Sequence, residues 1–575
     1  MYKIGVGKAD ITSFVENIGM LGYGKPDHIV QGIETPIYAR AFVISSSDTK
    51  VAFVNAELCF ITQSIKNGVI QYLKEHHPTL GYSDENIMLT AQHTHSTPGG
   101  YSHFGFYNIT IPGFIPEIYD TIVNGIAEAI LQAEASLTPG SISVRKGKFP
   151  AHIPVAFNRS IEAYNANPET ENVSTEEAHL AVNREMTLLL FENSEGIPLG
   201  VINWFGVHTT SVSNDCYHIC SDNKGYASQY LEQAYKDINP HFISAFAQGA
   251  CGDVTPNYKW DEEKKWTRGK FKDDYKSAQY NGYLQYHQAD QLIRKTPEAV
   301  ELPIRLDYVH QYVDMTQVIA DKQFVPFAQE IPQTSPPALG VAFLAGTLEG
   351  PGLSPLLHKP AILMSKVCRW YEQNIRTRFV DKKTQTDIQS KYKVHNPKNI
   401  IIESHLKHIL ATPNIKGLII PSFADLMIRN IKYFYKESAL NTHHWIQEKL
   451  PMQIFLIGSI AIIGIPAEIT TVAAERLQET LLSTLKNQGI TTIILSPYAN
   501  AYSGYITTYE EYMLQLYEGG HTIFGKWTLA AYQTVFRDLA SELQKAPSER
   551  SSQSSIFPAI FTKEDLALWK RPEFA

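Results

Sequence analysis

NIMLTAQHTHS, residues 86–96, is an apolar, strand-like run that ends in two histidines, His93 and His95. Side chains alternate along a strand with a period of two, so an extended segment places both imidazoles on one face. A neutral imidazole nitrogen is a common metal ligand. The segment therefore predicts a strand that delivers metal ligands at its end.

The segments around this strand alternate between strand-like and helix-like patterns. Two strand-like runs, at 39–47 and 50–58, precede it, together with an amphipathic, helix-like run at 62–77. A second helix-like run follows at 116–137. This order predicts an α/β fold of mixed α+β layers, with the histidines at the carboxyl end of a strand, where open sheets place their sites.

The region that follows, residues 141–211, is richer in strand-like runs, and His208 again ends an apolar run. A buried hairpin at 452–471 is predicted to lead into a helix at 472–486. The charged stretch 258–280 is predicted to be a solvated connection. Further strand-like runs occupy 141–149, 186–193 and 198–211.

Composition limits the class of protein. The 575 residues are 44% hydrophobic and 19% charged, with a formal net charge of -8 and a pI near 6.2. These values are typical of a large globular protein and argue against a nucleic-acid partner.

The chain shows no Sec-type signal and no apolar run of membrane-spanning length, and its five cysteines are too few and odd in number for a disulfide framework. We therefore expect a cytoplasmic protein, or one exported without a cleaved leader.

Ligand chemistry selects a candidate metal set. Catalytic zinc takes about three nitrogen or oxygen ligands from the protein, and His93, His208 and Glu468 would supply such a set. A tyrosine oxygen, such as that of Tyr505, is a less common ligand. Considered singly, each histidine is more typical of a hydrogen-bonded core residue, and Glu468 of a helix start, so sequence spacing alone does not assemble the site.

Several motifs together resemble the neutral (non-lysosomal) ceramidases, over roughly residues 3 to 530. The resemblance implies a zinc-dependent amidase that cleaves the N-acyl bond of ceramide to a sphingoid base and a fatty acid. Its partner would be ceramide or a related N-acyl sphingolipid, with transient contact at a membrane surface. The motifs are GVGKADIT, HTHSTPGGY at 93–101, FNRS at 157–160, INWFGVHTTS at 202–211, SDNKGYAS at 221–228, AFAQGACGDVTPN at 245–257, LAGTLEGPG at 344–352, PAEITT at 466–471 and NAYSGYITTYEEYMLQLYEGGHTIFG at 500–525.

The resemblance also implies roles for individual residues. The positions of the family's zinc ligands are occupied by His93, His208, Glu468 and Tyr505. Active-site positions that hydrogen-bond water, substrate or the tetrahedral intermediate are occupied by His95, Arg159 and Tyr517.

The position of the family's catalytic serine is occupied by Thr255. Threonine keeps the hydroxyl but adds a methyl group that restricts χ1. Cys251 is an alternative nucleophile, although a structural thiol is the more common role for such a residue. Two other functions stay open: a zinc amidase for another N-acyl lipid, and a catalytically impaired lipid-binding homologue.

The expected domain organisation is a catalytic domain over 1–530 and a short helix and tail over 531–575. Family members commonly carry an immunoglobulin-like β-sandwich at this end, and the remaining residues are too few for one. The amphipathic segment 527–545 is predicted to pack on the core. Residues 371–415 are predicted to form an insertion or a lid.

Overall fold

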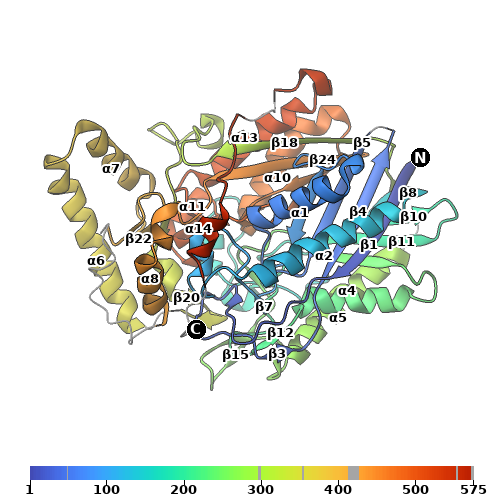
Figure 1. Ribbon diagram of the computed structural model, residues 1–575, viewed down its shortest axis with the longest axis horizontal. Helices are drawn as coiled ribbons and strands as arrows, with labels where there is room; N and C mark the ends of the chain where they lie inside the picture. Colours follow the sequence, from blue (N-terminus) through green and yellow to red (C-terminus); the bar gives the residue numbers. More distant parts are fainter. Residues whose placement is uncertain (48, 295–299, 353–354, 412–425, 552–554, 571–575) are drawn as a thin grey trace.

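The computed structural model describes residues 1–575 except 48, 295–299, 353–354, 412–425, 552–554 and 571–575. Two β-sheets pack face to face, and helices cover the outer face of each (Figure 1). The mixed α/β prediction is therefore confirmed.

The first sheet has nine strands in the order β13-β11-β10-β8-β1-β4-β5-β6, with β17 beside β8. The second sheet has four strands in the order β18-β24-β25-β27. The nine strands are β1 (Tyr2–Asp10), β4 (Tyr38–Ser46), β5 (Thr49–Ala56), β6 (Ile87–Ala91), β8 (Thr138–Lys148), β10 (Glu185–Asn193), β11 (Pro198–Phe205), β13 (Ile243–Gln248) and β17 (Val300–Glu301). The four are β18 (Leu306–Asp314), β24 (Lys449–Ile457), β25 (Ile460–Gly464) and β27 (Thr492–Ser496).

Strand β4 shows why the first sheet is buried on both faces. Ala39, Ala41 and Val43 belong to the core beneath the helices. Phe42 and Ile44 alternate with them and belong to the core between the two sheets. Because the side-chain period is two, the apolar residues of this strand supply both cores at once.

Helices α1 (Gln63–His76), α2 (Pro116–Ala135), α4 (Asp222–Tyr235) and α5 (Asp274–Arg294) cover the first sheet, whereas α10 (Thr471–Leu485) and α13 (Thr528–Glu542) cover the second. The buried residues of α13 include Tyr532 and Phe536, so the prediction that this amphipathic segment packs on the core is confirmed. The expected domain boundary after residue 530 falls inside α13.

An insertion joins β18 to β24 and forms an arm at the left of Figure 1. It includes the described part of the predicted insertion at 371–415; residues 412–415 lie outside the described residues. Its elements are β19 (Ala338–Gly340), β20 (Gly346–Thr347), β21 (Gly350–Pro351), α6 (Pro355–Asn374), α7 (Lys382–Val394), β22 (Ile400–Glu403), β23 (His408–Ile409), α8 (Leu426–Lys436) and α9 (Ala439–Thr442).

The remaining elements are short and lie mainly around the ends of the sheets. None of the described helices has both the length and the apolar composition needed to cross a membrane. The short elements are β2 (Met20–Leu21), β3 (Gly32–Ile33), β7 (Thr97–Pro98), β9 (Phe157–Asn158), β12 (His218–Ile219), β14 (Val254–Thr255), β15 (Lys259–Asp261), β16 (Trp266–Arg268), β26 (Glu468–Ile469), β28 (Tyr505–Ile506), α3 (Ile161–Asn165), α11 (Tyr509–Leu514), α12 (Tyr517–Gly520) and α14 (Lys563–Ala567).

Arg40 on β4 is a buried cation that joins the first sheet to α4. Its guanidinium lies 2.5 Å from Glu57 and 2.6 Å from Glu232. We expect Arg40→Met to lower the free energy of unfolding by about 3–5 kcal/mol, because the Glu57 carboxylate would stay buried without its partner. Urea unfolding would measure the change.

Lys146→Met is the matched control for this substitution. Lys146 on β8 lies 3.8 Å from Glu185, and both side chains are substantially exposed. Its removal should cost less than about 1 kcal/mol. Equal effects of the two substitutions would contradict the structural role of Arg40.

Candidate metal centre and active site

Three predicted ligands meet at the seam between the two sheets. His93 follows β6, His208 follows β11, and Glu468 opens β26 shortly after β25 of the second sheet. One ligand atom from each of the three lies within 4.8 Å of the others. Tyr505 on β28 is the direct partner of Glu468 in the parallel β26–β28 pair, which places the two side chains on the same face.

The backbone at His93 differs from the predicted strand. Strand β6 ends at Ala91, and His93 has a φ of 75°, in the left-handed region. The amide of His93 donates to the carbonyl of Leu58, which holds the turned backbone in place. The expectation that His93 and His95 lie on one face of a strand is therefore wrong. A strained backbone instead brings their Nε2 atoms to 3.0 Å.

Backbone carbonyls fix the orientation of both ligand imidazoles. The Nδ1 of His93 lies 2.6 Å from the carbonyl of Cys59, and the Nδ1 of His208 lies 2.6 Å from that of Cys251. Each Nδ1 therefore donates, and each Nε2 is directed toward the Glu468 carboxylate, the orientation that a shared metal ion requires. These Nε2 atoms lie 3.5 and 3.3 Å from the two oxygens of Glu468. Among the described residues, His208 Nε2 has no hydrogen-bond partner, so the donor set fits a cation.

The electrostatics of the three residues also fit a cation. Burial lowers the pKa of His93 to about 4, so this imidazole is neutral. Burial lowers the pKa of His208 too, but the neighbouring Cys251 and Glu468 raise it to about 10. Burial raises the pKa of Glu468, but His93 and His208 hold it well below its usual range. The carboxylate thus attracts a positive charge, and a divalent cation would replace the proton on His208.

Two tyrosines support the Glu468 carboxylate. The hydroxyl of Tyr498 donates to Oε2 at 3.1 Å, and that of Tyr502 donates to Oε1. The Cys251 thiol lies 3.0 Å from the Tyr498 hydroxyl and is fully buried, as expected of a structural thiol. Neither tyrosine was predicted from the sequence, although Tyr502 lies within the NAYSGY motif.

Arg159 lies at the centre of a buried polar network beside the candidate ligands. Its guanidinium lies 2.7 Å from Glu349 and 3.0 Å from Glu518. One terminal nitrogen also donates to the Tyr505 hydroxyl at 3.1 Å. Arg159 therefore joins the fourth predicted ligand to a carboxylate that the sequence did not single out, Glu349.

Thr255 lies against that same carboxylate. It is 3% exposed, and its hydroxyl donates to Glu349 Oε2 at 2.7 Å. Asn257 and Thr210 also donate to this oxygen, at 3.1 and 2.7 Å. The carbonyl of the preceding residue, Val254, accepts from His208 Nδ1 at 3.0 Å, so the β14 segment carries the Thr255 hydroxyl and orients a candidate metal ligand.

His95 and Tyr517 complete the predicted set. His95 is buried, with its Nδ1 unpartnered among the described residues and its ring edge against Tyr23. Gly22 leaves room for this ring, because a Cβ there would lie 2.4 Å from it. Tyr517 is half-buried, and its ring faces Arg159 at 5.5 Å and Tyr505 at 5.7 Å. All eight predicted site residues therefore lie in one connected region.

Glu349 is the main site residue that sequence reasoning missed. It lies in LAGTLEGPG, one of the segments that carry the family resemblance. A single carboxylate in a glycine-rich segment has no second polar residue at a spacing typical of a site, so the sequence does not mark it. Burial raises the pKa of Glu349, but Arg159 and His208 lower it below its usual value. It is therefore an anion inside the protein, where it needs the cation and hydroxyls around it.

The sequence is similar to those of known proteins over nearly its whole length. The sequence model of a family described as neutral/alkaline non-lysosomal ceramidase, N-terminal, matches residues 2–431 and 433–534. A neutral ceramidase of Pseudomonas aeruginosa is 31% identical, over 96% of this chain and 73% of the relative. Neutral ceramidase A of Dictyostelium discoideum is 32% identical, over 94% and 72%.

Solved structures are similar as well. A ceramidase solved in complex with C2 superposes with a TM-score of 0.78 at 29% identity, over 97% of this chain and 77% of that one. The crystal structure of neutral ceramidase from Pseudomonas aeruginosa gives a TM-score of 0.75, over 97% and 76%.

Proposed function

The chain belongs to the neutral/alkaline non-lysosomal ceramidase family, and from this membership we propose that it hydrolyses the amide bond of ceramide with a zinc ion held by His93, His208, Glu468 and Tyr505. The observation that carries the metal assignment is the convergence of the Nε2 atoms of His93 and His208 on one buried carboxylate. A zinc ion bound there would supply Lewis acidity at the reacting carbonyl.

The residues of the chain have separate tasks in this proposal. Thr255 presents a hydroxyl whose proton is directed to Glu349, so its oxygen lone pairs would be available to the substrate carbonyl. Arg159 and Tyr517, whose side chains lie beside each other, would donate hydrogen bonds to a developing oxyanion. His95 is a neutral imidazole that can accept a proton and pass it to the leaving amine.

Two other functions are compatible with the same residues. A zinc amidase for another N-acyl lipid would use the same donor set. A lipid-binding homologue with impaired turnover would follow if Thr255 could not replace serine. The intact network of Arg159, Glu349 and Thr255 favours turnover, because it holds the hydroxyl in a fixed orientation.

Fatty-acid release by the purified protein tests the proposal. We expect release from ceramide, its loss on chelation, and its recovery with zinc, because the metal would bind between His93, His208 and Glu468. The assay would compare untreated, chelated and zinc-restored samples.

Other N-acyl lipids serve as the comparison substrates. Release from these lipids but not from ceramide would establish the second function. Ceramide binding without release by zinc-loaded protein would establish the third.

A further inference from the structure

Helix α6 carries a row of apolar side chains on its outer face. Leu363, Met364, Val367, Trp370 and Tyr371 are between 49% and 63% exposed. Their spacing of three or four residues places them on one side of a helix. An amphipathic helix of a globular protein normally turns this side to the core, so the orientation of α6 is reversed.

Polar contacts fix this orientation. On the inner face, the Ser365 hydroxyl donates to the carbonyl of Ile400 at 2.8 Å. The buried carboxylate of Glu372 accepts from Lys391 at 2.5 Å and from Tyr392 at 2.7 Å. Rotating α6 to bury Trp370 would break these contacts and expose a buried anion. The exposed apolar face is therefore held outward by the fold.

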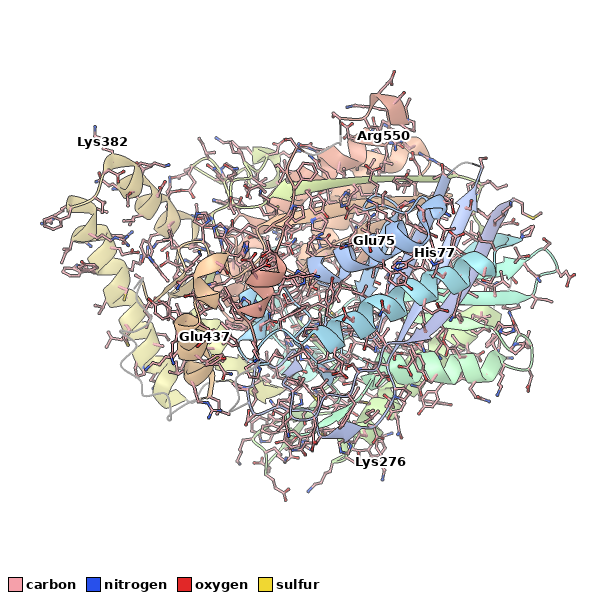
Figure 2. All side chains as sticks on the ribbon, viewed as in Figure 1. Glu75, His77, Lys276, Lys382, Glu437 and Arg550 are labelled. Atoms are coloured by element: carbon pink, nitrogen blue, oxygen red, sulfur yellow. The ribbon has the colours of Figure 1, made fainter. Side chains whose placement is uncertain are left out.

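The charges beside this face are mainly positive. Glu372 is the only acidic residue of α6, and it is buried. Among the described residues 358–383, Asp381 is the one exposed anion. Figure 2 shows Lys382 at the far end of the arm, pointing outward. The exposed cations of this stretch are Lys359, Lys366, Arg378, Lys382 and Lys383. The chain as a whole has a formal net charge of -8, so this stretch is locally opposite in sign.

We propose that α6 lies on the surface of an anionic lipid bilayer, with its apolar face at the boundary between headgroups and acyl chains; this inference rests on the proposed action on a lipid substrate. Trp, Tyr and Lys side chains are favoured at this depth, because each has an apolar part and a polar end. Basic residues beside an apolar helix face are the pattern that binds acidic lipids.

Helix α6, which carries the docking face, defined as Leu363, Met364, Val367, Trp370 and Tyr371, is linked to the active site through the chain that precedes it. Glu349 contacts Thr255 and Arg159, and α6 begins at Pro355. The 3-10 helix η6 (Val341–Ala345) contacts α6, and the ring of Phe343 lies 5.7 Å from that of Tyr517. One short stretch of chain therefore joins the membrane-facing helix to the catalytic residues, and docking would bring the site to its substrate.

Vesicle sedimentation tests the docking directly. We expect the protein to bind vesicles of phosphatidylcholine and phosphatidylglycerol without ceramide, and to bind phosphatidylcholine vesicles more weakly. Val367→Ser with Trp370→Ser should weaken binding about tenfold or more, because these side chains insert into the interface. Lys359→Glu with Lys366→Glu should weaken binding to the anionic vesicles by at least about fivefold for each lysine replaced.

Two exposed apolar residues provide the matched control, one shortly after α4 and one on α5. Ile238 and Tyr283 are 57% and 50% exposed and lie outside the arm. Ile238→Ser with Tyr283→Ser should leave vesicle binding unchanged. All variants alter exposed side chains, and their unfolding temperatures should match that of the wild type. Equal binding by the docking-face variant, the control and the wild type would overturn the proposal.

Two substrates separate this proposal from the proposed function. Val367→Ser with Trp370→Ser should reduce hydrolysis of ceramide embedded in anionic vesicles and spare hydrolysis of a dispersed short-chain ceramide. Wild-type binding to ceramide-free vesicles without hydrolysis of either substrate would remove the proposed function and leave the docking. A concentration-dependent dimer abolished by the same variant, without vesicle binding, would assign the face to a second copy and overturn the docking.

Discussion

His208→Asn is expected to remove the bound metal ion and to lower the rate of ceramide hydrolysis by at least about 10³-fold. A metal at a reacting carbonyl supplies several kcal/mol of transition-state stabilisation, which corresponds to this factor. The Nε2 of His208 lies 3.3 Å from Glu468, and its Nδ1 is held by backbone carbonyls. Elemental analysis of the purified protein would give the metal content per chain, and initial rates would give the activity.

His310→Asn is the control for this substitution. His310 is a buried histidine on β18, and its ring packs against Tyr312, away from the ligand atoms of the candidate metal centre. It should keep the metal and the rate. A full complement of metal in His208→Asn, with undiminished hydrolysis, would refute the assignment of His208 as a ligand.

Thr255→Val is expected to lower the rate of hydrolysis by about 10²–10³-fold while the metal is retained. Valine keeps the branched shape of threonine but lacks the hydroxyl, so it removes the group that donates to Glu349. Loss of one positioned hydroxyl or oxyanion donor typically has this size of effect. Initial rates and metal content, measured on the same preparation, separate this loss from that of His208→Asn.

Thr255→Ser provides the complementary test. It restores the family's residue and keeps the hydroxyl, so its rate should lie within about tenfold of the wild-type rate, or above it. Wild-type hydrolysis by Thr255→Val would rule out a role for the hydroxyl. A Thr255→Ser rate as low as that of Thr255→Val would show that the Glu349 contact does not orient a catalytic oxygen.

The elements that sequence predicted well are those defined by local periodicity. The hairpin predicted at 452–471 is β24 and β25, joined at Gly458 and Ser459, and the helix that follows is α10. The apolar runs of both strands leave few alternatives to a buried antiparallel pair. The candidate metal ligands were also selected from the sequence, but only through ligand chemistry combined with family resemblance, since nothing local joins His93 to Glu468.

The features that sequence missed depend on distant contacts. The left-handed backbone of His93 is held by the carbonyl of Leu58, far from it in the chain. Glu349 acquires its role only when Arg159 and Thr255 lie beside it. The periodicity of α6 is that of any amphipathic helix, and it does not encode which side faces solvent. In this helix the buried anion Glu372 fixes the choice.

The location of the candidate metal centre, between the two sheets, has a consequence for how the protein folds. Two candidate ligands follow strands of the first sheet, whereas Glu468 and Tyr505 come from the half of the chain that builds the second. Neither half presents a complete donor set, so high metal affinity arises late, after both sheets have docked in the correct register. Metal binding would then stabilise only fully assembled molecules. A chain whose sheets pack wrongly would remain both metal-free and inactive.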